Sequence, residues 1–254
     1  MKKNTIYCIG DSHVNVFSGN NSFPNQWPGK HVDRIPIFKT FWLGAHLAYS
    51  LHKPQNKARK DLFATLAKIP KGSWVLLSYG EIDCRVHLIR QSEIQQRPLA
   101  DVVYECVDKY FKVINQVRKK GYKVIVYHLI PSTAFKIEYQ EFPTYGSCIE
   151  RNQVTVLFNT RLSYWAKKYK LQEFSVYKYF LKKSGETNMK YYADPIHLST
   201  NALPIIIKEI NKNITGIDKK LLNKKYNINK LEYFYFCILR KKINYLYISI
   251  RNLI

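Results

Sequence analysis

Short apolar runs alternate with longer helical stretches over about 210 residues of this chain, and this alternation constrains the fold more than any other feature. The run at 122–131 is the clearest strand, because it is rich in β-branched residues and ends at a proline. Such alternation favours a parallel sheet with helices on both faces, so we predict a three-layer α/β/α domain. The predicted strands are 4–9, 73–80, 122–131 and 171–177, and the predicted helices are 38–53, 59–69, 99–120, 153–170 and 199–214.

Several chemically active side chains follow the predicted strands. Ser12 follows the first strand, the charged stretch 80–85 follows a central strand, and Pro131 ends another. Parallel strands end at the same edge of a sheet, and ligands bind beyond that edge. The sequence therefore predicts a site at the carboxyl edge of the sheet.

Charge and cysteine content limit the environment and the partners. The chain has 41 Lys and Arg against 18 Asp and Glu, a formal net charge of +23, which favours an anionic partner. We do not expect nucleic acid, because the lysines are spread along the chain and no nucleic-acid motif occurs. Five scattered cysteines without a CxxC pair argue against a zinc site or a disulfide framework and favour a reducing compartment.

Hydrophobic segments of the length needed for export or membrane insertion are missing from the sequence. The apolar run before Gly10 is shorter than the core of a secretory leader, and no stretch approaches the roughly 20 apolar residues of a membrane span. We therefore expect a cytoplasmic protein, with peripheral binding to the inner face of the membrane as a further expectation.

Two short motifs carry the residues of a nucleophilic site. Gly10-Asp11-Ser12 follows the first strand, and Asp194 lies three residues before His197 ahead of the last predicted helix. A serine needs a base to remove its proton, and a histidine held by a carboxylate is suited to that task. Taken separately, the motifs also fit a strand-closing turn and a capped, buried histidine.

Together, the two motifs resemble blocks I and V of the SGNH, or GDSL, hydrolases. Gly44 in "WLGAHLAYS" is similar to the block II glycine, and the resemblance covers residues 4 to about 214 by order and spacing. It implies a flavodoxin-like sheet and a Ser-His-Asp triad, in which Ser12 is the nucleophile, His197 the general base and Asp194 its orienting acid. It also implies an oxyanion hole built from the Ser12 and Gly44 amides. No metal or other cofactor is expected.

Block III departs from the family pattern. The stretch "YGEIDCR" (79–85) stands where the family has Gly-x-Asn-Asp, and Ile82 takes the place of the asparagine. Isoleucine cannot donate a hydrogen bond, and one lost oxyanion donor costs about 2.7–4 kcal/mol. Three explanations remain open: another group replaces the donor, acyl transfer is slower and more selective, or the domain binds a ligand without turnover. The candidate replacements are His13, Asn15, His46 and Arg85.

Charged side chains beside the predicted site form a second group. Glu81, Asp83 and Arg85 can make an internal salt bridge, or Arg85 can hold an acidic group of the substrate. As substrate-binding candidates we take Asp11, His13, His46, Glu81, Asp83 and Arg85.

The C-terminal sequence differs in composition from the rest. Residues 216–254 carry nine Lys or Arg and two acids, interleaved with aromatic and aliphatic residues. We therefore divide the chain into a hydrolase-like domain, 1–215, and a basic, aromatic-rich extension, 216–254. The extension is expected either to pack as a helical hairpin or to bind an anionic membrane surface or a partner protein.

The resemblance implies a serine esterase or an acetyl transferase. The expected substrate is an acylated carbohydrate or a precursor of a surface polysaccharide. The alternative is a weak or inactive carbohydrate-binding or scaffolding protein of polysaccharide biosynthesis, for which Ile82 is the main argument.

Overall fold

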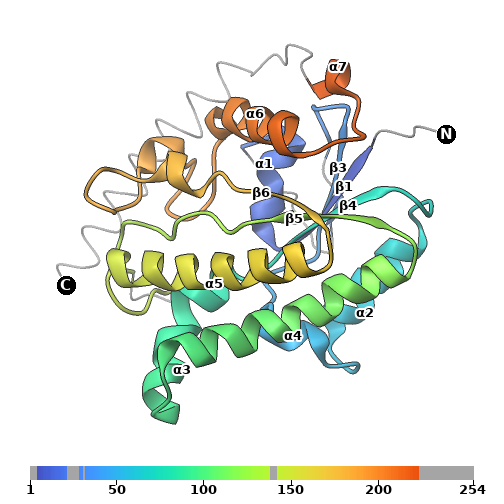
Figure 1. Cartoon of the computed structure of the whole chain (residues 1–254). Helices are drawn as coiled ribbons and strands as arrows, with labels where there is room; N and C mark the ends of the chain where they lie inside the picture. Colours follow the sequence, from blue (N-terminus) through green and yellow to red (C-terminus); the bar gives the residue numbers. More distant parts are fainter. Residues whose placement is uncertain (1–4, 22–28, 31, 138–141, 223–254) are drawn as a thin grey trace.

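A computed structural model of the chain describes residues 5–21, 29–30, 32–137 and 142–222 (Figure 1). The strands are β1 (Ile6–Gly10), β2 (Gly29–Lys30), β3 (Phe38–Trp42), β4 (Trp74–Ser78), β5 (Lys123–Tyr127) and β6 (Gln172–Phe174). The α-helices are α1 (Asn15–Ser18), α2 (Lys57–Ala67), α3 (Leu88–Gln95), α4 (Leu99–Lys119), α5 (Cys148–Lys168), α6 (Leu203–Asn213) and α7 (Lys219–Leu222).

The strands form a single sheet in the order β2-β3-β1-β4-β5-β6. All neighbours are parallel except the two-residue edge strand β2, which pairs antiparallel with β3. The five parallel strands thus follow the flavodoxin-like order, in which the first strand lies between the second and the third. This confirms the predicted sheet.

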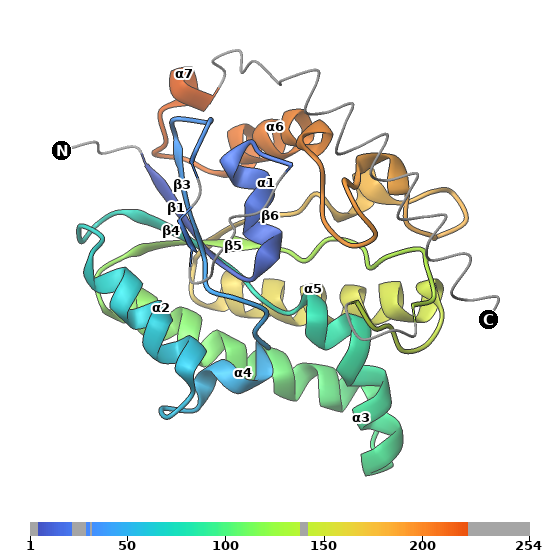
Figure 2. The same cartoon turned by 180° about the vertical axis from the view of Figure 1, so that it is seen from behind.

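Helices cover both faces of the sheet. On one face α2, α4 and α5 enclose a core built around Leu62, Val107 and Phe158, and on the other α1 and α6 enclose a core that includes Phe17 and Ile206 (Figures 1 and 2). The three-layer arrangement predicted from the alternation of strands and helices is therefore confirmed. Because both faces are buried, the central strands are apolar throughout, as in the fully buried strand β4.

The prediction of a helix over residues 38–53 is wrong. Phe38–Trp42 forms β3 beside β1, and Tyr49–His52 forms only a short 3₁₀ turn after an irregular loop. The spacing of Phe38, Phe41 and Trp42 fits a helix face, but the same residues can pack on a strand. The pairing with β1 decides between the two structures.

The first residues of the C-terminal extension pack on the domain. Ile217 and Leu222 are buried in the core on the α6 face, and the Trp74 indole N–H donates to the Gly216 carbonyl at 3.3 Å. Residues 223–254 lie outside the described residues, so the expectations for that part of the extension stay predictions. Among the residues that the structure describes, no helix is long and apolar enough to cross a membrane.

Candidate active site

A hydrogen-bonded chain joins Ser12, His197 and Asp194 at the carboxyl edge of the sheet. Ser12 begins a 3₁₀ turn just after β1, and its Oγ lies 2.7 Å from His197 Nε2. His197 Nδ1 lies 2.7 Å from Asp194 Oδ2. With its proton on Nδ1, His197 donates to Asp194, and Nε2 is left to accept from the Ser12 hydroxyl.

Close backbone packing fixes the position of Ser12. The Asp11 amide donates to the Ser78 carbonyl at 3.0 Å, which extends the contact between β1 and β4. Gly10 is required in this strand, because a Cβ there would lie 2.1 Å from the Ser78 carbonyl oxygen. The turn that carries Ser12 therefore starts from a central, closely packed part of the sheet.

The loop before α6 holds the Asp194 carboxylate toward His197. Asp194 Oδ1 accepts from the backbone amides of Ile196 and His197 at 2.9 and 2.7 Å, while Oδ2 faces the imidazole. Burial raises the pKa of Asp194, but the contacts with His197 and the two amides outweigh it and lower the pKa below its usual value. Asp194 is therefore ionised at neutral pH and suited to orient His197.

Asp11 is a buried capping residue. Its side chain is 1% exposed, and Oδ1 accepts from the His13 amide at 3.0 Å. Oδ2 has no hydrogen-bond partner among the described residues. Burial raises the pKa of Asp11 to about 7 against the lowering influence of His13. This placement assigns Asp11 to the nucleophile turn and leaves little of it for substrate contact.

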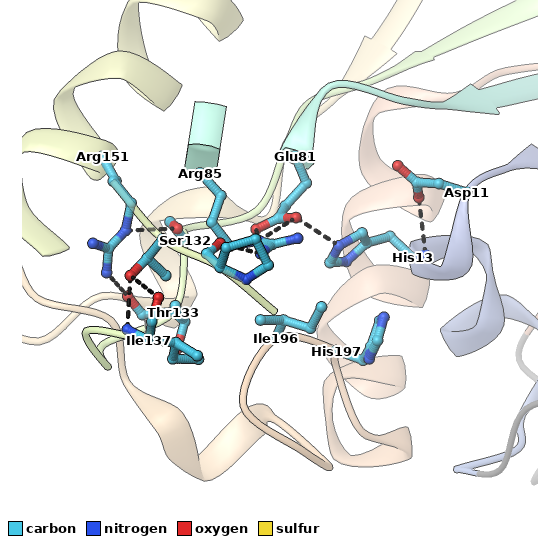
Figure 3. Close-up of polar contacts among 12 residues, drawn as sticks. Asp11, His13, Glu81, Arg85, Ser132, Thr133, Ile137, Arg151, Ile196 and His197 are labelled. Atoms are coloured by element: carbon cyan, nitrogen blue, oxygen red, sulfur yellow. Dashed lines mark hydrogen bonds and ion pairs between the residues drawn. The ribbon is translucent and has the colours of Figure 1, made fainter. Parts of the chain in front are cut away.

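His13, Glu81 and Arg85 form a buried row of charged groups beside His197 (Figure 3). Glu81 Oε2 lies 3.2 Å from His13 Nε2, and Arg85 Nε lies 2.9 and 3.0 Å from the two Glu81 oxygens. The rings of His13 and His197 are 5.0 Å apart between centroids. The row therefore forms a polar wall next to His197, and we call it the charged wall.

The charges within this wall stabilise one another. Although burial raises the pKa of Glu81, Arg85 and His13 lower it to about 2. The pKa of His13 is raised, because Asp11 and Glu81 outweigh the effect of its burial. The structure thus contains the internal salt bridge that the sequence left as one of two alternatives, and Arg85 Nη1 also donates to the Pro143 carbonyl at 2.5 Å.

Asp83 bonds to backbone amides and is not part of the Glu81–Arg85 ion pair. Its carboxylate is 1% exposed and accepts from the amides of Ala48 and Tyr49 at 2.8 and 3.2 Å. It therefore anchors the loop that follows Gly44, whose φ of +97° suits glycine. Burial raises the pKa of Asp83 to about 6 even with these bonds.

The position of the block III asparagine holds a half-buried Ile82 at the start of a π-helical segment, Asp83–His87. Of the candidate replacements, Asn15 donates to the Asn20 carbonyl, and Arg85 is bound to Glu81 and Pro143. His46 bonds to the Leu43 backbone and lies near the charged residues of α2.

His13 also stays a candidate donor, because its buried Nδ1 has no hydrogen-bond partner among the described residues. The contacts of His13 and His46 do not decide between the two as the group that compensates for Ile82.

Two features of the site were not predicted from the sequence. Arg151 on α5 is fully buried and donates to Ser132 Oγ and to the Thr133 and Phe135 carbonyls, so it fixes the loop after β5 (Figure 3). The Phe142 ring meets the His197 ring edge-on at 6.0 Å. An arginine just before a predicted helix and a phenylalanine in a loop carry no sequence signal for these contacts.

No metal site can be assigned within the described part of the chain. There, no group of three or more His, Cys, Asp or Glu side chains is arranged to hold a metal ion.

The fold of this chain is similar to that of solved structures described as an acylhydrolase and a GDSL-like lipase. A proposed acylhydrolase from Bacteroides fragilis is similar over 87% of this chain and 89% of its own, with a TM-score of 0.54 and 14% identity. A GDSL-like lipase from Bacteroides thetaiotaomicron is similar over 83% and 87%, with a TM-score of 0.53 and 14% identity. No protein-family model and no curated protein matches the sequence.

Proposed function

We propose that this protein is a serine ester hydrolase or acyl transferase of the SGNH type, with Ser12, His197 and Asp194 as its catalytic triad. The observation that carries the proposal is the unbroken chain of two 2.7 Å contacts from Ser12 through His197 to Asp194. A structural serine has no need of a histidine that is oriented by an ionised carboxylate.

The reaction follows from this geometry. His197 Nε2 takes the proton of Ser12 Oγ as that oxygen attacks the ester carbonyl, and Asp194 stabilises the imidazolium that forms. The Ser12 and Gly44 amides stabilise the negative oxygen. His197 then protonates the leaving alcohol, and water or a sugar hydroxyl releases the acyl group from Ser12.

The charged wall supports a short acyl group and a polar substrate. The His13 ring lies 5.0 Å from the ring of His197, and His13 is paired with Glu81, so charged groups lie close to the base of the proposed triad. A long alkyl chain placed there would meet polar groups and gain little from burial. We therefore propose acetyl esters of carbohydrates, including precursors of surface polysaccharides, as the substrate class.

Chain-length profiles of p-nitrophenyl esters test this proposal. Wild type should hydrolyse the acetate faster than the octanoate, and Ser12→Ala should abolish both activities. The variant His13→Leu/Glu81→Leu/Arg85→Leu replaces the buried charges together, so it leaves no single charge unpaired, and it should shift the preference toward longer chains. Equal activity in wild type and Ser12→Ala would remove Ser12 from the mechanism.

A non-catalytic carbohydrate-binding role is the second candidate, and Ile82 favours it. In that case a folded wild type binds an acetylated oligosaccharide without releasing acetate. Calorimetric titration combined with an acetate-release assay distinguishes the two functions.

A further inference from the structure

The end of the domain opposite Ser12 carries a dense group of exposed lysines. Helices α2, α4 and α5 each lead into a parallel strand, so all three end at the amino edge of the sheet (Figures 1 and 2). The chain after α6 returns to the same edge, where Thr215 bonds to Gln172 and Gly216 to Trp74. The exposed lysines are Lys68, Lys71, Lys119, Lys120, Lys123, Lys167, Lys168, Lys170, Lys212, Lys219 and Lys220. We call this surface the basic end.

Acidic residues are almost missing from the same segments. In the stretches 68–74, 118–124, 167–171 and 212–222, the one carboxylate is Asp218. The carboxyl edge, by contrast, carries the carboxylates Asp11, Glu81, Asp83 and Asp194 together with cations such as Arg85. Positive charge without nearby carboxylates is therefore concentrated at the basic end.

The stabilising effect of lysines at helix C-termini explains only some of the lysines at the basic end. Lysines in a last helical turn offset the helix dipole, but Lys71, Lys123 and Lys170 lie beyond the helix ends. Elsewhere, some exposed lysines pair with acids, as in Lys57–Asp61 and Lys182–Glu186. Within the described residues, no ion pair with a carboxylate is formed by a lysine of the basic end. Many unpaired like charges on one surface favour an anionic partner.

Aromatic rings lie beneath several of these lysines. Lys71 Nζ is 4.1 Å from the centre of the Tyr122 ring, and Lys123 Nζ is 5.3 Å from that of Trp74. The Tyr122 and Trp74 side chains are only 3% and 6% exposed, so these two rings cannot stack on the bases of a nucleic acid. Tyr164, near Lys168, is 48% exposed, so nucleic acid is included in the test below. What the basic end offers is a layer of ammonium groups, which suits the head groups of anionic lipids.

We propose that the basic end binds the surface of an anionic lipid bilayer. Bound in this way, the domain turns its carboxyl edge, with Ser12, away from the membrane and toward water. The chain also continues from Leu222 at the basic end into 223–254, where the sequence has seven Lys or Arg and one acid. This surface is separate from the catalytic site, so the proposal does not depend on the proposed function.

Vesicle sedimentation with the full chain tests the proposal. The variant Lys68→Glu/Lys119→Glu/Lys167→Glu/Lys170→Glu changes lysines of the basic end that make no ring contact named above. The control Lys53→Glu/Lys60→Glu/Arg90→Glu/Lys183→Glu makes the same change in net charge on exposed residues nearer the carboxyl edge. Both variants keep residues 223–254, and a thermal melt verifies that each is folded.

Wild type and the control should sediment with vesicles of phosphatidylcholine and phosphatidylglycerol, but not with phosphatidylcholine alone. Partitioning of the basic-end variant should fall by about tenfold or more, and added salt should weaken wild-type binding. An equal loss of vesicle binding in both variants would show that binding depends on net charge alone, and it would overturn the proposal. So would full binding by the basic-end variant, or tighter binding of wild type to duplex or single-stranded DNA than to the vesicles at the same salt concentration.

Discussion

Replacing Asp11 by asparagine should stabilise the protein at alkaline pH. Burial raises the pKa of Asp11 from 3.8 to about 7, so the folded state holds this proton more tightly than the unfolded chain. The stability that Asp11 contributes is therefore fully present below about pH 4 and is lost as the pH rises through 7. One pKa unit corresponds to about 1.4 kcal/mol, so the loss approaches about 4 kcal/mol by pH 8.

Asparagine removes the ionisation but keeps an oxygen that can accept from the His13 amide, as Oδ1 does in the wild type. Urea unfolding at pH 5 and pH 8 measures the effect. The free energy of unfolding of Asp11→Asn should exceed that of wild type by more at pH 8 than at pH 5. The exposed Asp101→Asn serves as control and should show little change with pH. A variant less stable than wild type at pH 8 would mean that the folded protein stabilises the Asp11 carboxylate, against this reasoning.

Three further predictions concern the site. Asp194→Asn should lower kcat by about a thousandfold or more, because the amide no longer selects the tautomer of His197; kcat within tenfold of wild type would exclude an orienting role. Asp83→Asn should cost about 1–3 kcal/mol in unfolding free energy and also lower kcat/KM, since a lost amide bond to Ala48 loosens the Gly44 loop; an unchanged melt would contradict this. Ile82→Asn should raise kcat/KM on an acetyl ester by about tenfold, or about 1.4 kcal/mol, by restoring a donor, and an unchanged rate in a folded variant would show that another group already fills the oxyanion hole.

Much of the fold was predictable, because it depends on local patterns that the sequence displays directly. The β-branched run at 122–131 and the apolar run at 73–80 both became central parallel strands. Pro204 lies in the first turn of α6, where the missing amide proton costs no helical hydrogen bond. In each case the local preference and the tertiary environment favour the same structure.

The region after Gly44 could not be predicted in the same way, since distant residues determine it. The Asp83 carboxylate holds Ala48 and Tyr49 from 35 and 34 positions away. Likewise, Arg151 reaches the loop after β5 across 16 to 19 positions. Contacts of this kind leave no periodicity in the sequence, and only the folded chain brings the partners together.

Labelling with a fluorophosphonate, followed by mapping of the modified peptide by mass spectrometry, tests the central claim most directly. The reagent reacts with a serine only when a base activates it. The account predicts one adduct, on Ser12, that forms much more slowly in His197→Ala and does not form in Ser12→Ala. An adduct on another residue, or equal labelling of Ser12 with and without His197, would contradict the proposed triad.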